Sequence, residues 1–204
     1  MALFTPPGIH EGFRWRGMRV GLLGGSFNPP HEGHVHIAQT ALRALNLDCV
    51  WWMVTPQNPL KGAKDTLPFD QRFAMCRELT RHDPRMVISD LDLRCNNIYS
   101  ITMLQNMRTM FPLTRFVFIA GTDILTHLPH WHNWRNLQKT TALAFVERPP
   151  ALSLVRHHCL HLPGLKNHHL AAQGSSPTLK AGNCYWISGH KLHPQSSTKI
   201  RNII

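Results

Sequence analysis

Two histidines, His31 and His34, follow a glycine-rich turn near the start of the chain and have the types and spacing for anion chemistry. Residues 24–34 read Gly-Gly-Ser-Phe-Asn-Pro-Pro-His-Glu-Gly-His. An apolar run precedes this turn and apolar residues at helical spacing follow it, which predicts the order strand, turn, helix. Free amides at a helix start bind phosphate, and both imidazoles can donate to the same anion. The turn residues assigned to phosphate binding are Gly24, Gly25 and Ser26.

A metal site is the alternative interpretation of His31 and His34. No third ligand follows at a suitable spacing, so we expect no metal bound by protein side chains. The positive end of a helix dipole disfavours a cationic imidazole, whereas a bound triphosphate favours one. We expect the triphosphate to dominate and His34 to act as a partly cationic donor.

Length and composition predict one globular domain. The chain has 204 residues, 43% of them hydrophobic, which is enough to bury a single core. Residues 1–17 show no periodicity and are expected to be a flexible leader, with one domain over residues 18–204. The five cysteines form no Cys-x-x-Cys pair, and the chain has neither a signal peptide nor a membrane-spanning run. These features favour a cytoplasmic protein that does not bind membranes.

The net charge is +11, from 22 Lys and Arg against 11 Asp and Glu. Such a balance favours anionic partners, although a basic solvated surface explains most of it. A dedicated nucleic-acid-binding domain would more often carry a dense basic run or an aromatic stacking platform, and neither is present. We therefore expect nucleotides rather than nucleic acid, with a basic nucleic-acid-binding protein as the distant alternative.

Apolar runs alternate with helical patterns along the chain, which predicts an α/β fold with a doubly wound, mostly parallel sheet. Helices are expected over residues 35–45 and 67–82, from residue 97, and briefly after residue 123. The strands are expected over residues 18–23, 48–54, 85–89, 114–120, 141–146 and 183–188.

The turn resembles the signature of the His-x-Gly-His nucleotidyltransferases, and it is most similar to that of the bacterial nicotinate-nucleotide adenylyltransferases. These enzymes make deamido-NAD and pyrophosphate from nicotinate mononucleotide and ATP. The resemblance implies their Rossmann-like nucleotidyltransferase fold, catalytic phosphate contacts from His31 and His34, and Mg²⁺ carried with ATP. Asn28 stands where many members have Asp, and a neutral side chain repels triphosphate less.

The end of the chain carries a second candidate anion site. Ser196 or Ser197 could cap a helix that places Thr198 and Arg201 on one face, although an exposed polar terminus is the alternative. The Ser-Ser-Thr-x-Ile-Arg stretch resembles a family motif that clamps the β- and γ-phosphates opposite the histidines. The resemblance thus assigns a catalytic role to Arg201 and ATP binding to Ser197 and Thr198.

Two further loops follow predicted strands. Lys61 and Lys64 could reach a phosphate or be solvated, and the resemblance favours phosphate binding by Lys61. Gly121 and Asp123 place a glycine and an acid after a strand, as in ribose recognition, although Asp123 could simply begin a helix. The resemblance implies that this Gly-x-Asp faces the adenosine half of the ligand.

Other matches to the family concern the pyridine nucleotide. Ser100, with Tyr99 beside it, matches a hydroxyl that meets the nicotinate carboxylate, although Ser100 could also cap a helix. Trp131 matches a tryptophan that stacks on the pyridine ring, whereas Trp131 and Trp134 together could form a core or dimer patch. Arg148 fits an Arg-Pro turn near the nucleotide and is grouped with these residues.

Several alternatives stay open on the sequence. A sister enzyme could act on nicotinamide mononucleotide or phosphopantetheine, or transfer a cytidylyl group. The histidine-rich residues 151–183 match no zinc motif and are interpreted as a variable insertion without an assigned function. The oligomeric state is open between a monomer and a homo-oligomer.

Overall fold

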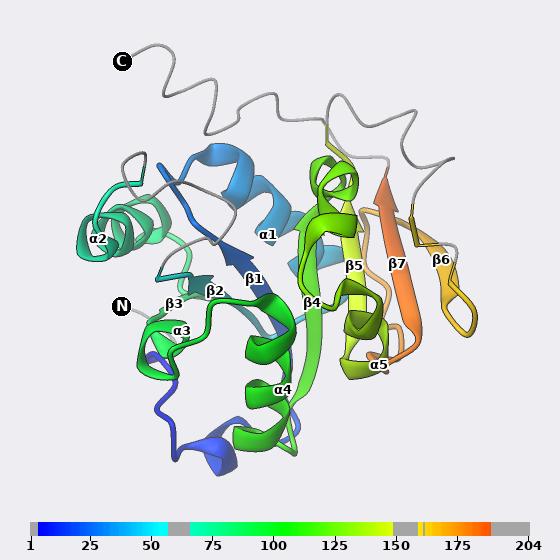
Figure 1. Ribbon diagram of the computed structural model, residues 1–204, viewed down its shortest axis with the longest axis horizontal. Coiled ribbons are helices and arrows are strands. Elements are labelled where there is room, and N and C mark those ends of the chain that lie inside the picture. Colours follow the sequence, from blue (N-terminus) through cyan, green and yellow to red (C-terminus); the bar gives the residue numbers. More distant parts are fainter. Residues whose placement is uncertain (1–3, 57–65, 149–158, 161, 189–204) are drawn as a thin grey trace.

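The computed structural model describes residues 4–56, 66–148, 159–160 and 162–188. Within these ranges the core is a seven-stranded sheet in the order β3-β2-β1-β4-β5-β7-β6, and every neighbouring pair is parallel. Figure 1 shows β1 and β4 side by side near the middle of the sheet. The strands are β1 Arg19–Gly25, β2 Cys49–Val54, β3 Met86–Ser89, β4 Arg115–Gly121, β5 Ala142–Val146, β6 Lys166–Ala171 and β7 Asn183–Ser188.

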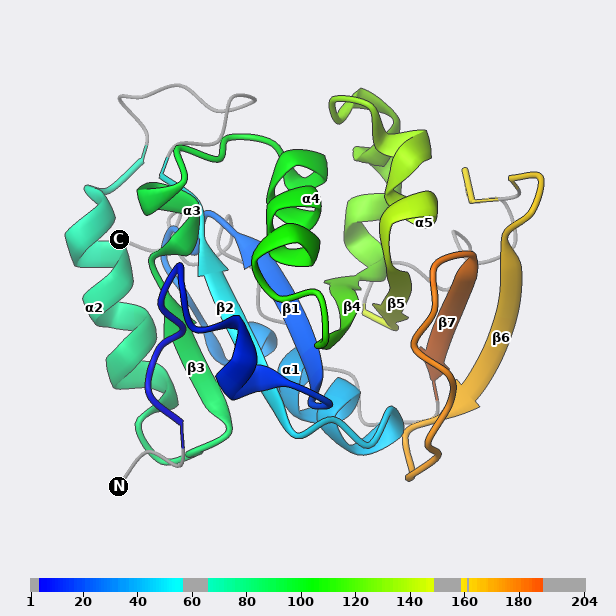
Figure 2. The ribbon, with the colours of Figure 1, turned by 90° about the horizontal axis from the view of Figure 1, so that it is seen from below.

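Helices cover both faces of the sheet, so the predicted doubly wound architecture is confirmed. Figure 2 shows α4 and α1 on opposite sides of the strands. The α-helices are α1 Glu32–Ala44, α2 Phe69–Thr80, α3 Leu91–Arg94, α4 Ser100–Met110 and α5 Leu137–Thr140. Short 3-10 helices are η1 Gly12–Trp15, η3 Thr122–Thr126, η4 Leu128–His130 and η5 Trp134–Asn136.

Alternation along the central strands divides the core into two layers. Leu22 and Trp51 lie in the layer covered by α4, whereas Leu23 and Trp52 lie in the layer covered by α1. All four side chains are nearly or completely buried. A strand that is buried on both faces must be apolar at every position, which explains why β1 and β2 stand out as apolar runs.

The described part of the expected leader, residues 4–17, includes a side chain that packs in the core. Trp15 is only 1% exposed and packs edge-on against Trp51, with 4.6 Å between ring centroids. The hydroxyl of Thr114 donates to the carbonyl of Trp15 at 2.9 Å. One buried tryptophan on a single 3-10 turn produces no hydrophobic periodicity, so the sequence pattern gave no sign of this packing.

The edge strand β6 lies in the segment interpreted as a variable insertion. Its sequence, Lys-Asn-His-His-Leu-Ala, is mostly exposed and has no apolar alternation. It pairs with β7 through the backbone, and the indole N–H of Trp186 donates to Asn167 Oδ1 at 2.8 Å. Both faces of this edge strand are largely exposed, so its pairing with β7 does not require apolar side chains.

None of the helices among the described residues has the length and apolarity needed to cross a membrane. The five cysteines all lie in the described ranges and are free thiols. Burial raises the pKa of Cys49 and Cys76 to about 12, so these thiols stay protonated and act as small apolar groups.

Candidate active site

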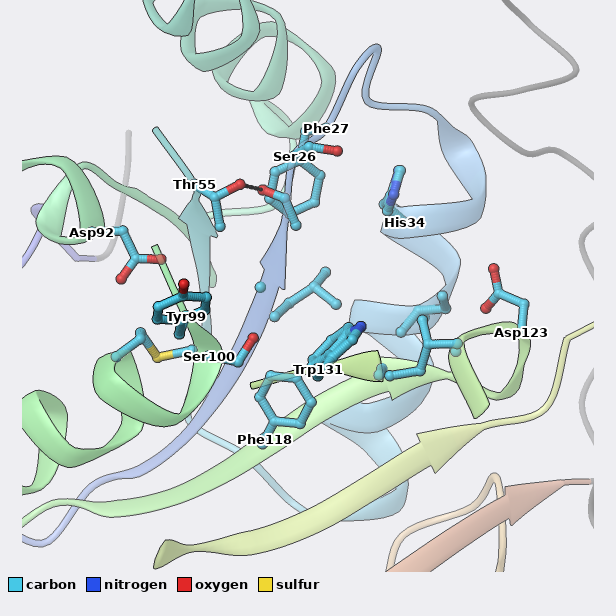
Figure 3. Close-up of a pocket in the computed structure, with 18 of the residues that line it drawn as sticks. Ser26, Phe27, His34, Thr55, Asp92, Tyr99, Ser100, Phe118, Asp123 and Trp131 are labelled. Carbon is cyan, nitrogen blue, oxygen red and sulfur yellow. Dashed lines mark hydrogen bonds between the residues drawn. The ribbon is translucent and has the colours of Figure 1, made fainter. Parts of the chain in front are cut away.

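A cavity of about 510 Å³ opens where the order of the strands reverses, at the carboxyl ends of β1 and β4. Ligands of open parallel sheets bind at this switch point. Figure 3 shows side chains converging on it from both faces of the sheet. The predicted site residues that line the cavity are Gly24, Gly25, Ser26, His34, Tyr99, Ser100, Gly121, Asp123, Trp131 and Arg148.

The turn after β1 is shaped by close packing around Phe27. This residue has a φ of 45°, is buried, and stacks on Trp52 with 5.0 Å between ring centroids. A Cβ on Gly25 would lie 3.2 Å from the Phe27 ring, so this position favours glycine. The backbone beside Ser26 is thereby held at the mouth of the cavity.

The two histidines cap helix α1 reciprocally. His31 is the N-cap, and its Nδ1 accepts a hydrogen bond from the Gly33 N–H at 3.1 Å. In return, His34 Nδ1 accepts from the His31 N–H at 3.3 Å. Because each Nδ1 is an acceptor, each neutral ring carries its proton on Nε2. This arrangement favours a neutral His34 donor over the partly cationic one expected from the sequence.

The histidines differ in their access to the cavity. His34 is half-buried and lines it, whereas His31 is 4% exposed and lies behind, with 3.9 Å between the two ring centroids. Direct ligand contact is therefore better supported for His34, and orientation of the helix start is better supported for His31.

Arg72 of α2 is a buried cation that the sequence analysis did not select. It is 1% exposed and its guanidinium donates to the carbonyls of Leu67, Ser26, Thr55 and Pro56 at 2.7 to 2.9 Å. Burial lowers the pKa of Arg72, but an arginine remains charged in proteins. The side chain joins the glycine-rich turn after β1 to the loop that follows β2 and to the start of α2.

Two neutral side chains complete this junction. Asn28 is 2% exposed, and its Oδ1 accepts a hydrogen bond from the Leu67 N–H at 3.0 Å. The hydroxyl of Thr55 donates to the Gly25 carbonyl at 3.2 Å (Figure 3). A neutral amide at position 28 supplies the acceptor without adding a buried carboxylate to this junction.

Asp123 and Arg148 form an ion pair at the end of β4, with 3.3 Å between Arg148 Nη1 and Asp123 Oδ2. The Arg148 N–H also donates to the Thr122 hydroxyl at 3.0 Å. A Cβ on Gly121 would collide with Asp123 Oδ1, so a larger residue there would require the Asp123 side chain to move. Arg148 thus lies with the residue assigned to the adenosine half, whereas the resemblance grouped it with the pyridine nucleotide.

The opposite wall comes from the start of α4 and the segment after η4. Tyr99 is the N-cap and Ser100 the first helical residue, so Ser100 does not cap this helix. Trp131 is partly exposed and lines the cavity, with its ring edge-on to Phe118. Trp134 is buried in the core, and Trp131 packs against the same core cluster from the side of the cavity.

Sequence reasoning missed several cavity residues. Asp92 follows β3, and an acid just beyond the carboxyl end of a strand was a usable signal. His130 and His132 flank the selected Trp131, and His132 stacks on Tyr99 with 4.5 Å between ring centroids. The missed polar or ionisable residues of the lining are Thr55, Asp92, His130 and His132.

Four predicted phosphate ligands, Lys61, Ser197, Thr198 and Arg201, lie outside the described residues. Their roles stay predictions. Within the described ranges, no three side chains of His, Cys, Asp or Glu come close enough together to hold a metal ion.

Comparison with known proteins identifies the class of the chain as cytidylyltransferase-like, because the model of that family matches residues 22–203. A relative from Ruegeria sp. (strain TM1040) is 41% identical over 190 residues, covering 90% of this chain and 96% of the relative. One from Parvibaculum lavamentivorans is 47% identical over 133 residues, covering 65% and 66%. Both are named "probable nicotinate-nucleotide adenylyltransferase". The chain belongs to the nicotinate-nucleotide adenylyltransferase family.

A solved structure supports the fold independently. The nicotinic acid mononucleotide adenylyltransferase of Plasmodium falciparum, in complex with NaAD, matches with a TM-score of 0.69 at 16% identity. The match covers 91% of this chain and 83% of that one. The predicted Rossmann-like nucleotidyltransferase fold is therefore confirmed.

Proposed function

We propose that the protein transfers the AMP moiety of ATP to nicotinate mononucleotide, giving deamido-NAD and pyrophosphate. The observation that carries this proposal is a cavity that extends from the start of α1 to the wall of Tyr99, Ser100 and Trp131. One end offers helix amides and the His34 imidazole to phosphates, and the other offers an indole and a hydroxyl to a pyridine ring. The relatives' names support the same two substrates.

The reaction is an in-line displacement at the α-phosphorus of ATP. An oxygen of the 5′-phosphate of nicotinate mononucleotide forms a new bond to the α-phosphorus of ATP. The bond between the α-phosphorus and the oxygen that bridges the α- and β-phosphates breaks, and pyrophosphate leaves with that oxygen. No covalent intermediate with the protein is needed, so catalysis rests on alignment and on stabilising charge. His34 donates from Nε2 to the phosphoryl oxygens, and His31 holds the ring of His34 through the capping hydrogen bond.

Mg²⁺ would enter with ATP, as part of the substrate. The triphosphate supplies its hard oxygen ligands, so the protein's task is to hold the phosphates. We assign this task to the start of α1, with Lys61, Ser197, Thr198 and Arg201 as the further ligands that the resemblance implies.

The ion pair at the end of β4 belongs to the part of the cavity that we assign to ATP. Asp123 accepts from the ribose hydroxyls of the adenosine half, and Arg148 keeps its carboxylate in place from a buried position. We therefore assign Arg148 to the ATP side of the cavity. The pyridine nucleotide lies on the other side, between Trp131 and the start of α4.

Steady-state assays of pyrophosphate release with ATP and alternative acceptors test the function. We expect nicotinate mononucleotide to give deamido-NAD with one pyrophosphate released for each dinucleotide formed. Phosphopantetheine should give no product. Turnover of phosphopantetheine without turnover of either pyridine mononucleotide would contradict the proposal and favour a sister enzyme.

Trp131→Ala tests where the pyridine ring binds. Loss of a stacked indole costs about 1 kcal/mol beyond its buried area, so the KM for nicotinate mononucleotide should rise at least about fivefold. The KM for ATP should stay within about twofold, and Trp131→Phe should recover much of the loss because it keeps an aromatic face. A rise confined to the KM for ATP would show that Trp131 serves the other substrate.

A further inference from the structure

Asp92 is a buried carboxyl in the wall of the cavity that the mechanism does not use. It belongs to the one-turn helix α3 and is only 2% exposed. Figure 3 shows its carboxyl group beside Tyr99, on the wall that also carries Ser100. A carboxyl group next to the expected place of a substrate carboxylate needs an explanation, because two negative charges would repel each other there.

The hydrogen bonds of Asp92 leave one of its oxygens available to a ligand. Oδ1 accepts from Asn97 Nδ2 at 3.2 Å, and Asn97 Oδ1 in turn accepts from Asn106 Nδ2 at 2.8 Å. The Asn97 N–H also donates to the Asp92 carbonyl at 2.7 Å. Among the described residues, Oδ2 takes part in no hydrogen bond or ion pair. The carboxyl is thus oriented by a chain of amides that reaches α4, with Oδ2 left for the cavity.

Among the described residues, no cation forms an ion pair with the buried Asp92 carboxyl. Arg94, on the same short helix, is half-exposed, and its Nη1 lies 4.0 Å from Asp90 Oδ1. Burial raises the pKa of Asp92 to about 7, opposed only by the hydrogen bond from Asn97. A neutral carboxyl carries an O–H and can donate a hydrogen bond. Within the part of the chain that the structure describes, the other ionisable side chains on β2 and on residues 90–100 are Cys49, Asp90, Arg94, Cys95 and Tyr99. His132 stacks on Tyr99.

Given the proposed function, we infer that Asp92 determines the choice between a pyridine carboxylate and a pyridine carboxamide: its neutral carboxyl donates from Oδ2 to the substrate's carboxylate. Ser100 and the start of α4 bind the same group from the other side. In the ionised form, Asp92 repels the carboxylate but accepts from the NH₂ of a carboxamide. The preference for nicotinate mononucleotide over nicotinamide mononucleotide therefore falls as Asp92 loses its proton.

The test is the ratio of kcat/KM for nicotinate mononucleotide to kcat/KM for nicotinamide mononucleotide, measured across pH. Titration of the substrate 5′-phosphate, of ATP and of His34 acts on both substrates and cancels in this ratio, and Asp92→Asn separates the effect of Asp92 from that of His130 and His132 on the same wall. For a free-enzyme pKa of about 7, the wild-type ratio should fall about 30-fold between about pH 6 and about pH 8.5. In Asp92→Asn, whose amide donates at every pH, the ratio should stay constant.

Three results would overturn this inference: a constant ratio in the wild type, an equal fall in Asp92→Asn, or a rise with pH. The first and the last require no variant, so a folding defect in Asp92→Asn cannot protect the inference. If neither pyridine mononucleotide reacts, the proposed function fails, and calorimetric titration with nicotinate mononucleotide decides the role of Asp92. Weaker binding of nicotinate mononucleotide above about pH 7 in the wild type, but not in Asp92→Asn, would support the role of Asp92. Binding that does not depend on pH in the wild type would refute that role.

Discussion

Replacing His34 with alanine should lower kcat by about two to four orders of magnitude, the usual contribution of one positioned donor or acid–base group. His34 is the histidine of the His-x-Gly-His turn that lines the cavity, and its Nε2 carries the proton because Nδ1 accepts the His31 N–H. Pyrophosphate release at saturating substrates measures the loss. The KM for nicotinate mononucleotide should change little, since the pyridine ring binds at the other end of the cavity.

His34→Ala also removes half of the reciprocal cap, which costs about 1 kcal/mol of helix stability. Urea unfolding separates this cost from the loss of catalysis. His36→Ala is the matched control, because it removes an imidazole from the same helix but not from the cavity lining. We expect that control to keep turnover within about twofold. Turnover of His34→Ala within tenfold of the wild type would remove His34 from the mechanism.

Arg72→Met should lower the free energy of unfolding by about 3 to 5 kcal/mol, as expected when a buried charged donor is removed and its acceptors are left behind. Four backbone carbonyls lose their donor, among them those of Ser26 and Thr55. The KM for ATP should rise as well, because Ser26 belongs to the turn assigned to phosphate binding. Urea unfolding and steady-state kinetics measure the two effects.

Arg72→Lys is the control that separates charge from geometry. Lysine keeps the positive charge but has three donors on one atom and lacks the planar fork that reaches several loops. An intermediate loss of stability is expected. A free energy of unfolding of Arg72→Met within about 1 kcal/mol of the wild-type value would mean that water replaces the guanidinium. Arg72 would then not hold the turn.

The sequence predicted the central part of the molecule because its signals are local. Strands such as β2 are buried on both faces and so are apolar throughout, and their expected bounds differ from the observed ones by one or two residues. The pairing of a glycine turn with two histidines likewise depends on neighbours in the chain. In the structure, His31 and His34 cap the same helix that the turn predicts.

The features that the sequence did not reveal depend on partners far along the chain. Arg72 occupies an apolar helical repeat, and its acceptors are carbonyl groups that any residue provides. Trp15 is buried because β2 places Trp51 beside it. Asp92 is informative only once its burial and its neighbour Asn97 are known. The terminal motif of Ser197 and Arg201 lies outside the described residues and stays a prediction.

A crystal structure of the protein with bound deamido-NAD is the decisive test of where the two substrates bind, because the product contains both halves of the proposed ligand. We predict its bridging phosphates within hydrogen-bond reach of His34 Nε2 and the start of α1. The pyridine ring should lie on Trp131 with its carboxylate between Ser100 and Asp92, and the adenosine ribose should face Asp123. A dinucleotide bound with its pyridine ring beside Asp123, or outside this cavity altogether, would contradict the account.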